Sequence, residues 1–141
     1  MIYLDTSAFL KLYLLEAGSQ EVQAHVSSQD EPLPVWDILE AEFTNALYLK
    51  VFWREITREQ AKEQIARFAE RKRRGLYHTP DVDRTQLMTV FSRLREETPR
   101  LGCRSLDILH VACACLLQAK AFLTFDARQR SLAEHAGLPV P

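Results

Sequence analysis

Two short apolar runs, one near each end of the chain, constrain the fold most strongly. Residues 2–4 read Ile-Tyr-Leu and stop at Asp5, and residues 121–125 read Ala-Phe-Leu-Thr-Phe and stop at Asp126. Neither run alternates regularly between apolar and polar residues, which is typical of strands buried on both faces of a parallel sheet. Helical patterns fill the sequence between them, so we expect an α/β fold with a central parallel sheet and helices on both faces.

The helical segments have clear start and stop signals. Asp37 with Glu40 and Thr57 with Gln60 fit capping boxes, whereas Gly75 and Pro99 are typical stops. With 141 residues and no internal repeat or linker, we expect one domain over residues 1–141. The predicted helices cover residues 8–16, 19–27, 37–53, 57–74, 83–97, 106–119 and 127–135, and shorter extended segments cover 33–36, 76–79 and, as an edge strand, 138–140.

The composition excludes several functional classes. Eighteen basic and 19 acidic residues give a net charge of -1, which provides no general basic face for holding duplex DNA. Cys103, Cys113 and Cys115 form no C-x-x-C pair, so we expect buried, reduced thiols. The longest apolar run, 108–117, is interrupted by His110 and is too short to span a membrane. The first residues do not resemble a signal peptide, and we expect a soluble, cytoplasmic protein.

Four acidic residues occupy unusual places. Asp5 and Asp126 end the two strands at the carboxyl edge, where parallel sheets bind ligands. Glu42 interrupts an apolar helix, and Asp107 begins one that is apolar nearly all round. Converging carboxylates repel by roughly 3 kcal/mol per pair at about 5 Å and an effective dielectric constant near 20. Protonation or a cation would relieve this repulsion, and oxygen ligands favour Mg²⁺ or Mn²⁺.

Each acid also has a purely structural interpretation. Asp5 fits an Asx-turn and Asp126 fits a helix cap. Asp107 fits the helix dipole, and Glu42 fits a solvent-facing helix position. These alternatives remain open at this stage.

Four sequence blocks resemble the PIN-domain family, and most closely its VapC-type branch of toxin–antitoxin pairs. The blocks are MIYLDTSAFLKLY, LEAEFTNALY, SLDILHVACA and AFLTFDARQRSLAEHAGLPV. The resemblance implies a single α/β/α sandwich with a central parallel sheet and a Mg²⁺- or Mn²⁺-dependent endoribonuclease that hydrolyses RNA phosphodiester bonds. It places the family's catalytic acids on Asp5, Glu42, Asp107 and Asp126. Of these, Asp5 and Asp107 would hold the principal metal ion, with Asp126 and Glu42 binding directly or through water.

The resemblance also implies an auxiliary role for three hydroxyl residues, Thr6, Ser7 and Thr124. As alternatives, Thr6 or Ser7 caps the first helix and Thr124 only favours the strand. For His110, three residues after Asp107, we expect a packing role rather than membership of the acidic set.

The implied partners are an RNA substrate, an antitoxin protein and a second copy of the chain in a homodimer. The basic run Arg71, Lys72, Arg73 and Arg74 is a candidate for RNA-phosphate contacts, with a solvated helix end as the alternative. Apolar residues at helical spacing would line an antitoxin groove or, equally well, the core: Phe9, Leu12, Leu15, Phe43, Leu47 and Phe52.

Two other functions fit the same residues. One is a housekeeping RNA-processing PIN nuclease without an antitoxin. The other is a catalytically silent PIN module that only binds a partner.

Overall fold

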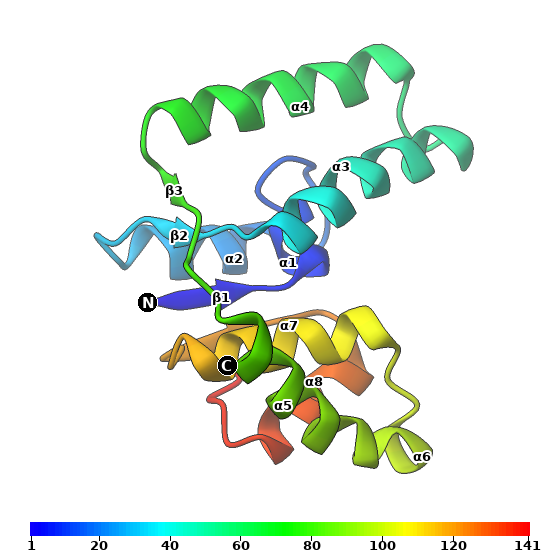
Figure 1. Ribbon diagram of the computed structural model, residues 1–141. Helices are drawn as coiled ribbons and strands as arrows, with labels where there is room; N and C mark the ends of the chain where they lie inside the picture. Colours follow the sequence, from blue (N-terminus) through cyan, green and yellow to red (C-terminus); the bar gives the residue numbers. More distant parts are fainter.

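The computed structural model describes residues 1–141 and has parallel strand pairs enclosed by helices (Figure 1). Strand β1 (Ile2–Leu4) pairs with β4 (Ala121–Leu123), and β2 (Leu33–Pro34) pairs with β3 (Tyr77–His78), both in parallel. In the first pair Leu4 lies opposite Leu123. The predicted buried strands at the two ends of the chain are therefore confirmed and lie side by side.

The helices form two layers around the strands. In Figure 1, helices α1 to α4 lie above β1 and helices α5 to α8 lie below it, which confirms the expected α/β/α arrangement. The helices are α1 (Thr6–Leu10), α2 (Ser19–Ser27), α3 (Asp37–Phe52), α4 (Arg58–Arg73), α5 (Arg84–Leu94), α6 (Thr98–Leu101), α7 (Ser105–Leu116) and α8 (Ala127–His135), with a 3-10 turn at Arg95–Glu97.

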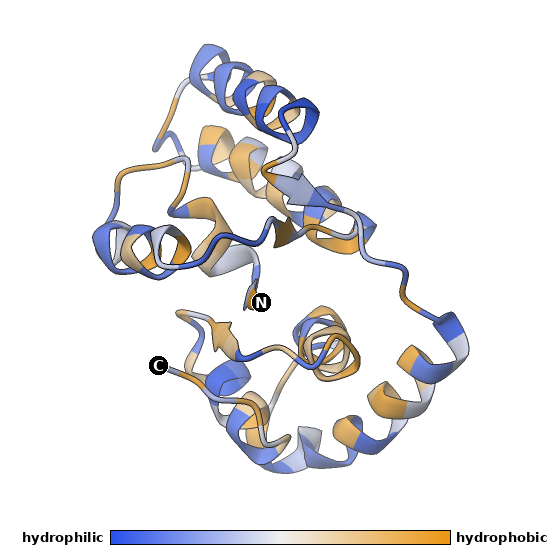
Figure 2. Ribbon diagram, turned by 90° about the vertical axis from the view of Figure 1, so that its left-hand side faces the viewer, coloured by the Kyte–Doolittle hydropathy of each residue, from blue (hydrophilic) through white to orange (hydrophobic).

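Helices α4 and α7 differ most clearly in hydropathy, and each lies where its composition suits it. Helix α4, at the top of Figures 1 and 2, is largely hydrophilic and buries only Ala61 and Phe68. Helix α7, seen end-on in the lower half of Figure 2, is mostly hydrophobic and lies in the core. No helix is both long enough and apolar enough to cross a membrane.

An aromatic cluster fixes α1 against α3 and α4. The Phe9 ring has its centroid 5.1 Å from that of Phe43, 5.4 Å from that of Tyr77 and 6.1 Å from that of Phe68. Tyr13 completes the cluster, 4.7 Å from Phe43, and its hydroxyl is hydrogen bonded to that of Tyr77 at 2.6 Å. These edge-on and tilted contacts are favourable aromatic geometries and hold the first helix in place.

The cluster also decides part of the predicted antitoxin groove. Phe9, Phe43 and Leu47 are buried in the core and cannot line a surface. In contrast, Leu15 and Phe52 are 93% and 78% exposed.

Among the cysteines, Cys103 and Cys113 are buried and Cys115 is half-buried, and all three are free thiols.

Several predicted boundaries are wrong. The first helix stops at Leu10 instead of residue 16, because the chain continues in turns closed by Ser19, whose Oγ accepts from Glu16 N and donates to Leu14 O. Residues 138–140 form no strand, since a single hydrogen bond, from Phe122 N to Pro139 O at 2.8 Å, joins them to β4.

Two helix signals act differently from the prediction. Asp37 lies inside α3 rather than capping it, since the N-cap residue is Trp36, with no side-chain bond. Pro99 does not end the helical region but lies in the first turn of α6, where a missing N–H costs nothing. The capping box of Thr57 and Gln60 is confirmed, as is the stop at Gly75, which has a left-handed φ of 78°.

Candidate active site

The four acids singled out from the sequence line one cavity of about 370 Å³. They reach it from four helix segments: Asp5 at the start of α1, Glu42 in the middle of α3, Asp107 in the first turn of α7, and Asp126 at the start of α8. The parallel pairing of β1 with β4 brings Asp5 and Asp126 to the same sheet edge, as expected. The cavity is thus acidic and lies where the sequence predicted it.

Asp5 is the most deeply placed of these carboxylates, at 3% exposed. Its Oδ1 accepts from Ala8 N at 2.9 Å and from Ser7 Oγ at 2.7 Å, and its Oδ2 accepts from Thr124 Oγ1 at 2.7 Å. Burial raises the pKa of Asp5 above its ordinary value, although the hydrogen bonds from Ala8, Thr124 and Ser7 act in the opposite direction. A nearby cation would favour the charged form of this side chain.

Thr124 ties Asp5 to the fourth acid. Its Oγ1 lies 2.7 Å from Asp5 Oδ2 and accepts from Asp126 N at 3.0 Å. Asp126 caps α8, because its Oδ1 accepts from the N–H groups of Arg128 and Gln129 at 2.8 and 3.0 Å. The structural interpretation of Asp126 is therefore correct, but it uses only Oδ1 and leaves Oδ2 for the cavity.

Asp107 is held in a similar way. Its Oδ2 accepts from the backbone N–H of Arg104 at 2.8 Å, just before α7 begins. Gln129 Nε2 donates to the Asp107 carbonyl at 3.1 Å, which links the starts of α7 and α8. The local hydrogen bond orients the carboxylate, and Oδ1 accepts no hydrogen bond from the chain.

Glu42 is hydrogen bonded on one oxygen. Its Oε2 accepts from Thr6 Oγ1 at 3.0 Å and forms a short contact with His110 Nε2. Burial raises the pKa of Glu42, but the hydrogen bonds from His110 and Thr6 outweigh it and hold the pKa below its ordinary value. Glu42 is therefore a carboxylate at neutral pH, and the solvent-facing interpretation of this residue is wrong.

The hydroxyl residues take part in the site. Thr6 donates to Glu42, Ser7 donates to Asp5 and accepts from Phe125 N at 2.9 Å, and Thr124 joins Asp5 to Asp126. None of the three caps the first helix, because Asp5 itself accepts the hydrogen bond that caps α1.

The donor set of the cavity suits a hard divalent cation. Its four carboxylates are oxygen ligands, and three of them, Glu42, Asp107 and Asp126, keep one oxygen that accepts no hydrogen bond from the chain. In the present arrangement no three acidic, histidine or cysteine side chains are close enough to hold an ion together. Chemically the residues fit Mg²⁺ or Mn²⁺, and small side-chain movements or bridging waters would complete the coordination.

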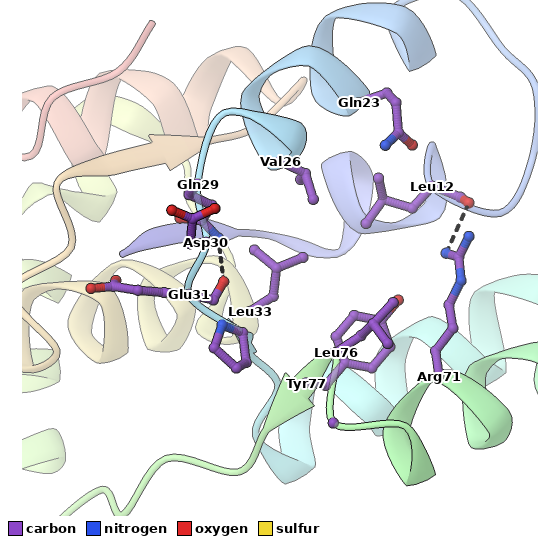
Figure 3. A pocket seen from close by; sticks show the side chains of 12 residues that line it. Leu12, Gln23, Val26, Gln29, Asp30, Glu31, Leu33, Arg71, Leu76 and Tyr77 are labelled. Atoms are coloured by element: carbon purple, nitrogen blue, oxygen red, sulfur yellow. Dashed lines mark hydrogen bonds between the residues drawn. The ribbon is translucent and has the colours of Figure 1, made fainter.

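The basic run lies apart from this cavity. Arg71 stacks on Tyr13, with the guanidinium carbon 4.9 Å from the ring centroid. Figure 3 shows that it also donates to Leu12 O, at 3.4 Å. It lines a second cavity of about 330 Å³, which contains none of the four acids. Lys72 pairs with Glu40 at 2.6 Å, and Arg73 pairs with Glu70. A role of residues 71–74 toward RNA therefore stays a prediction, made from a position outside the acidic cavity.

Sequence reasoning missed two residues at the mouth of the acidic cavity. Arg104, whose side chain is 82% exposed, and Trp53, 57% exposed, line both this cavity and an adjoining one of about 570 Å³. A signal was present for Arg104, since it stands three residues before Asp107 at the start of an apolar helix.

Comparisons with known proteins agree with this fold. The profile of the PIN domain matches residues 2–135. Among solved structures, FitAcB from Neisseria gonorrhoeae is similar, with a TM-score of 0.70 and 18% identity over 99% of this chain and 96% of that chain. VapBC2 from Rickettsia felis, bound to a DNA fragment from their promoter, has a TM-score of 0.68 and 16% identity over 100% and 98% of the two chains.

A third structure, VapBC-1 from nontypeable Haemophilus influenzae, has a TM-score of 0.67 and 17% identity over 100% of this chain and 97% of that chain. At these identities the likeness concerns the fold. No curated protein matches the chain.

Proposed function

Because the chain belongs to the PIN-domain family, we propose that it is a metal-dependent endoribonuclease and the toxin of a type II toxin–antitoxin pair. The observation that carries this proposal is the single cavity lined by Asp5, Glu42, Asp107 and Asp126. PIN domains are generally nucleases, and the similar structures are toxin–antitoxin assemblies. Such a protein would act in the cytoplasm, on RNA.

In this proposal Asp5 and Asp107 hold a Mg²⁺ or Mn²⁺ ion, with Asp126 and Glu42 binding it directly or through water. The chemistry that such an ion supplies when bound is a lowered pKa for a coordinated water and compensation of charge on the phosphoryl oxygens. Glu42 Oε1 and Asp126 Oδ2 accept no hydrogen bond from the chain, so either oxygen is available to take the proton of the attacking water.

Arg104 and Trp53 give the cavity features suited to a nucleic-acid strand. The Arg104 guanidinium forms only a loose ion pair, 3.6 Å from Asp107 Oδ2, and is free to contact a phosphate. The exposed Trp53 ring offers a surface on which a base can stack. We propose that these side chains, rather than the basic run alone, hold the RNA beside the acids.

We propose that the antitoxin covers the opening of the acidic cavity. Leu49, Trp53 and Leu106 are all at least 40% exposed and border the acidic residues. An amphipathic segment that packs on this apolar border and presents a cation to the acids would block access of RNA to the cavity. A homodimer is also proposed, by similarity to the family.

The test is cleavage of an RNA panel, including tRNA and rRNA fragments, by the purified protein in Mg²⁺, Mn²⁺ or EDTA. We expect cleavage with either metal, none in EDTA, and none with Asp107→Asn, whose backbone bond to Arg104 the amide oxygen can retain. A folded wild type that cuts no RNA in any metal would contradict the proposal and favour a partner-binding module. A neighbouring gene for a DNA-binding antitoxin would distinguish the toxin from a housekeeping nuclease.

We expect Arg104→Gln to raise KM for RNA about tenfold while kcat changes little, because one charge-assisted hydrogen bond is worth about 1.5 kcal/mol. The Asp107 carboxylate stays in place, since its hydrogen bond comes from the Arg104 backbone N–H, which the substitution keeps, and the ion pair with the side chain is loose. Initial rates over a range of RNA concentrations measure the effect. Arg58→Gln, an exposed arginine at the start of α4, is the matched control and should leave KM unchanged. An unchanged KM in Arg104→Gln would remove this residue from the substrate site.

A further inference from the structure

A buried chain of hydrogen bonds runs behind Glu42. His110, on α7, is 2% exposed; its Nδ1 lies 2.8 Å from the hydroxyl of Tyr3 in β1, and its Nε2 contacts Glu42 Oε2. Thr6 Oγ1 donates to the same Glu42 oxygen. The ring of His110 is enclosed edge-on by Tyr3 and Trp36, with centroids 5.9 and 6.0 Å away. These hydrogen bonds therefore join β1, α7, α3 and α1 at the Glu42 carboxylate.

The donors and acceptors of this chain can be assigned. A carboxylate only accepts hydrogen bonds, so the contact with Glu42 requires a proton on His110 Nε2. In the Nε2-protonated tautomer of the ring, Nδ1 is an acceptor to which the Tyr3 hydroxyl can donate. Burial keeps Tyr3 protonated, since its pKa lies well above the ordinary value. Every hydrogen in the chain thus points toward Glu42.

We propose that His110 is a positioning residue for the nuclease reaction: it holds Glu42 in one orientation, and Tyr3 fixes the His110 tautomer that makes this possible. The two donors occupy Oε2, which leaves Oε1 as the oxygen available to the cavity. The inference rests on the proposed function, and it replaces the expectation that His110 serves packing alone.

Packing alone does not explain this arrangement. An apolar side chain would fill this space without needing hydrogen-bond partners. Both ring nitrogens of His110 instead have partners, and one partner is a carboxylate of the acidic cavity. His135, which is exposed on α8 and pairs with Glu97 at 3.6 Å, is the contrasting surface histidine.

The test compares His110→Phe with His110→Gln. The phenylalanine keeps a planar ring and removes both hydrogen bonds, and we expect kcat to fall about 10- to 100-fold with KM unchanged, the range typical of residues that orient a ligand group. The glutamine amide can again donate to Glu42 and should recover most of kcat. His135→Gln is the control and should keep wild-type kcat. Wild-type kcat in folded His110→Phe, or no recovery with His110→Gln, would overturn the proposal.

A second measurement does not need activity or the His110 variants to fold. Nitrogen-15 NMR of the wild-type protein should show His110 protonated on Nε2 and unprotonated on Nδ1, and Glu42→Gln should shift the Nε2 proton upfield because an amide oxygen is a weaker acceptor. Tyr3→Phe should weaken the preference for this tautomer. A proton found on Nδ1 alone would overturn the hydrogen bond itself. A wild type that cuts no RNA overturns instead the proposed function, and the catalytic role of His110 with it.

Discussion

Asp5→Asn is expected to abolish RNA cleavage while making the metal-free protein more stable. The charge compensation that a bound cation supplies is worth several kcal/mol, and each 1.36 kcal/mol is a factor of ten, so we expect a loss of about 1000-fold or more. The amide fits the space of the carboxylate. Its oxygen still accepts from Ala8 N and Ser7 Oγ, and its NH₂ group can donate to Thr124, whose hydroxyl then turns to Gln129 Oε1, 3.1 Å away.

The stability change has a defined dependence on pH. The pKa of Asp5 is raised in the folded protein, so the folded state binds this proton more tightly than the unfolded state. Wild-type stability therefore falls as the pH rises above the ordinary value of 3.8, and the variant escapes this loss. The two proteins should unfold alike in acid and diverge toward neutral pH. Urea unfolding in EDTA at several pH values measures this divergence.

Adding Mg²⁺ should make the wild type more stable than Asp5→Asn, which reverses their order in EDTA. A ligand that binds only the folded state at about 100 times its Kd adds about 2.7 kcal/mol, and the wild type should gain this whereas Asp5→Asn should not. Asp81→Asn, at an exposed position before α5, is the control and should change neither cleavage nor stability. A large fall in the melting temperature of metal-free Asp5→Asn would show instead that Asp5 has a structural role.

Phe9→Ala is expected to give the largest loss of stability, about 3–5 kcal/mol, as is typical of a buried phenylalanine. Phe9 is 1% exposed, and its ring contacts four other aromatic rings, which come from the turn after α1, α3, α4 and β3. Removing the ring leaves a cavity among these elements, and they cannot all move inward to fill it. Because small domains have only about 5–15 kcal/mol of stability, much of the variant should be unfolded under mild denaturant.

The urea midpoint of Phe9→Ala should fall with little change in slope. The control is Leu15→Ala, which removes an apolar side chain that is 93% exposed and should change the free energy of unfolding by no more than about 0.5 kcal/mol. A loss below about 1.5 kcal/mol in Phe9→Ala would mean that the aromatic cluster repacks around the gap.

Predictions from the sequence succeeded where local chemistry is unambiguous. The short apolar runs before Asp5 and Asp126 predicted the parallel strands, and the same two residues predicted the edge where the cavity lies. Thr57 with Gln60 fixed a helix start because its capping box needs only local contacts. Glu42 stood out because it interrupts an otherwise apolar stretch of its helix.

The errors arose where long-range contacts decide the outcome. Pro99 indicates a stop or a first turn equally well, and the packing of α6 selects the second. The hydrogen-bond partners of His110, Tyr3 and Glu42, are 107 and 68 residues away in the sequence, so the proposed positioning role had no local signal. Asp126 shows that two interpretations can hold together, because one carboxylate oxygen caps the helix and the other remains for the site.

The pairing of β1 with β4 determines when the acidic cavity can form during synthesis of the protein. Asp5 is synthesised 119 residues before its hydrogen-bond partner Thr124. At roughly 5–20 residues per second, several seconds pass before the second half of the acidic cavity leaves the ribosome. A growing chain therefore carries no assembled cavity until β4 and Asp126 have been synthesised and can fold back onto β1.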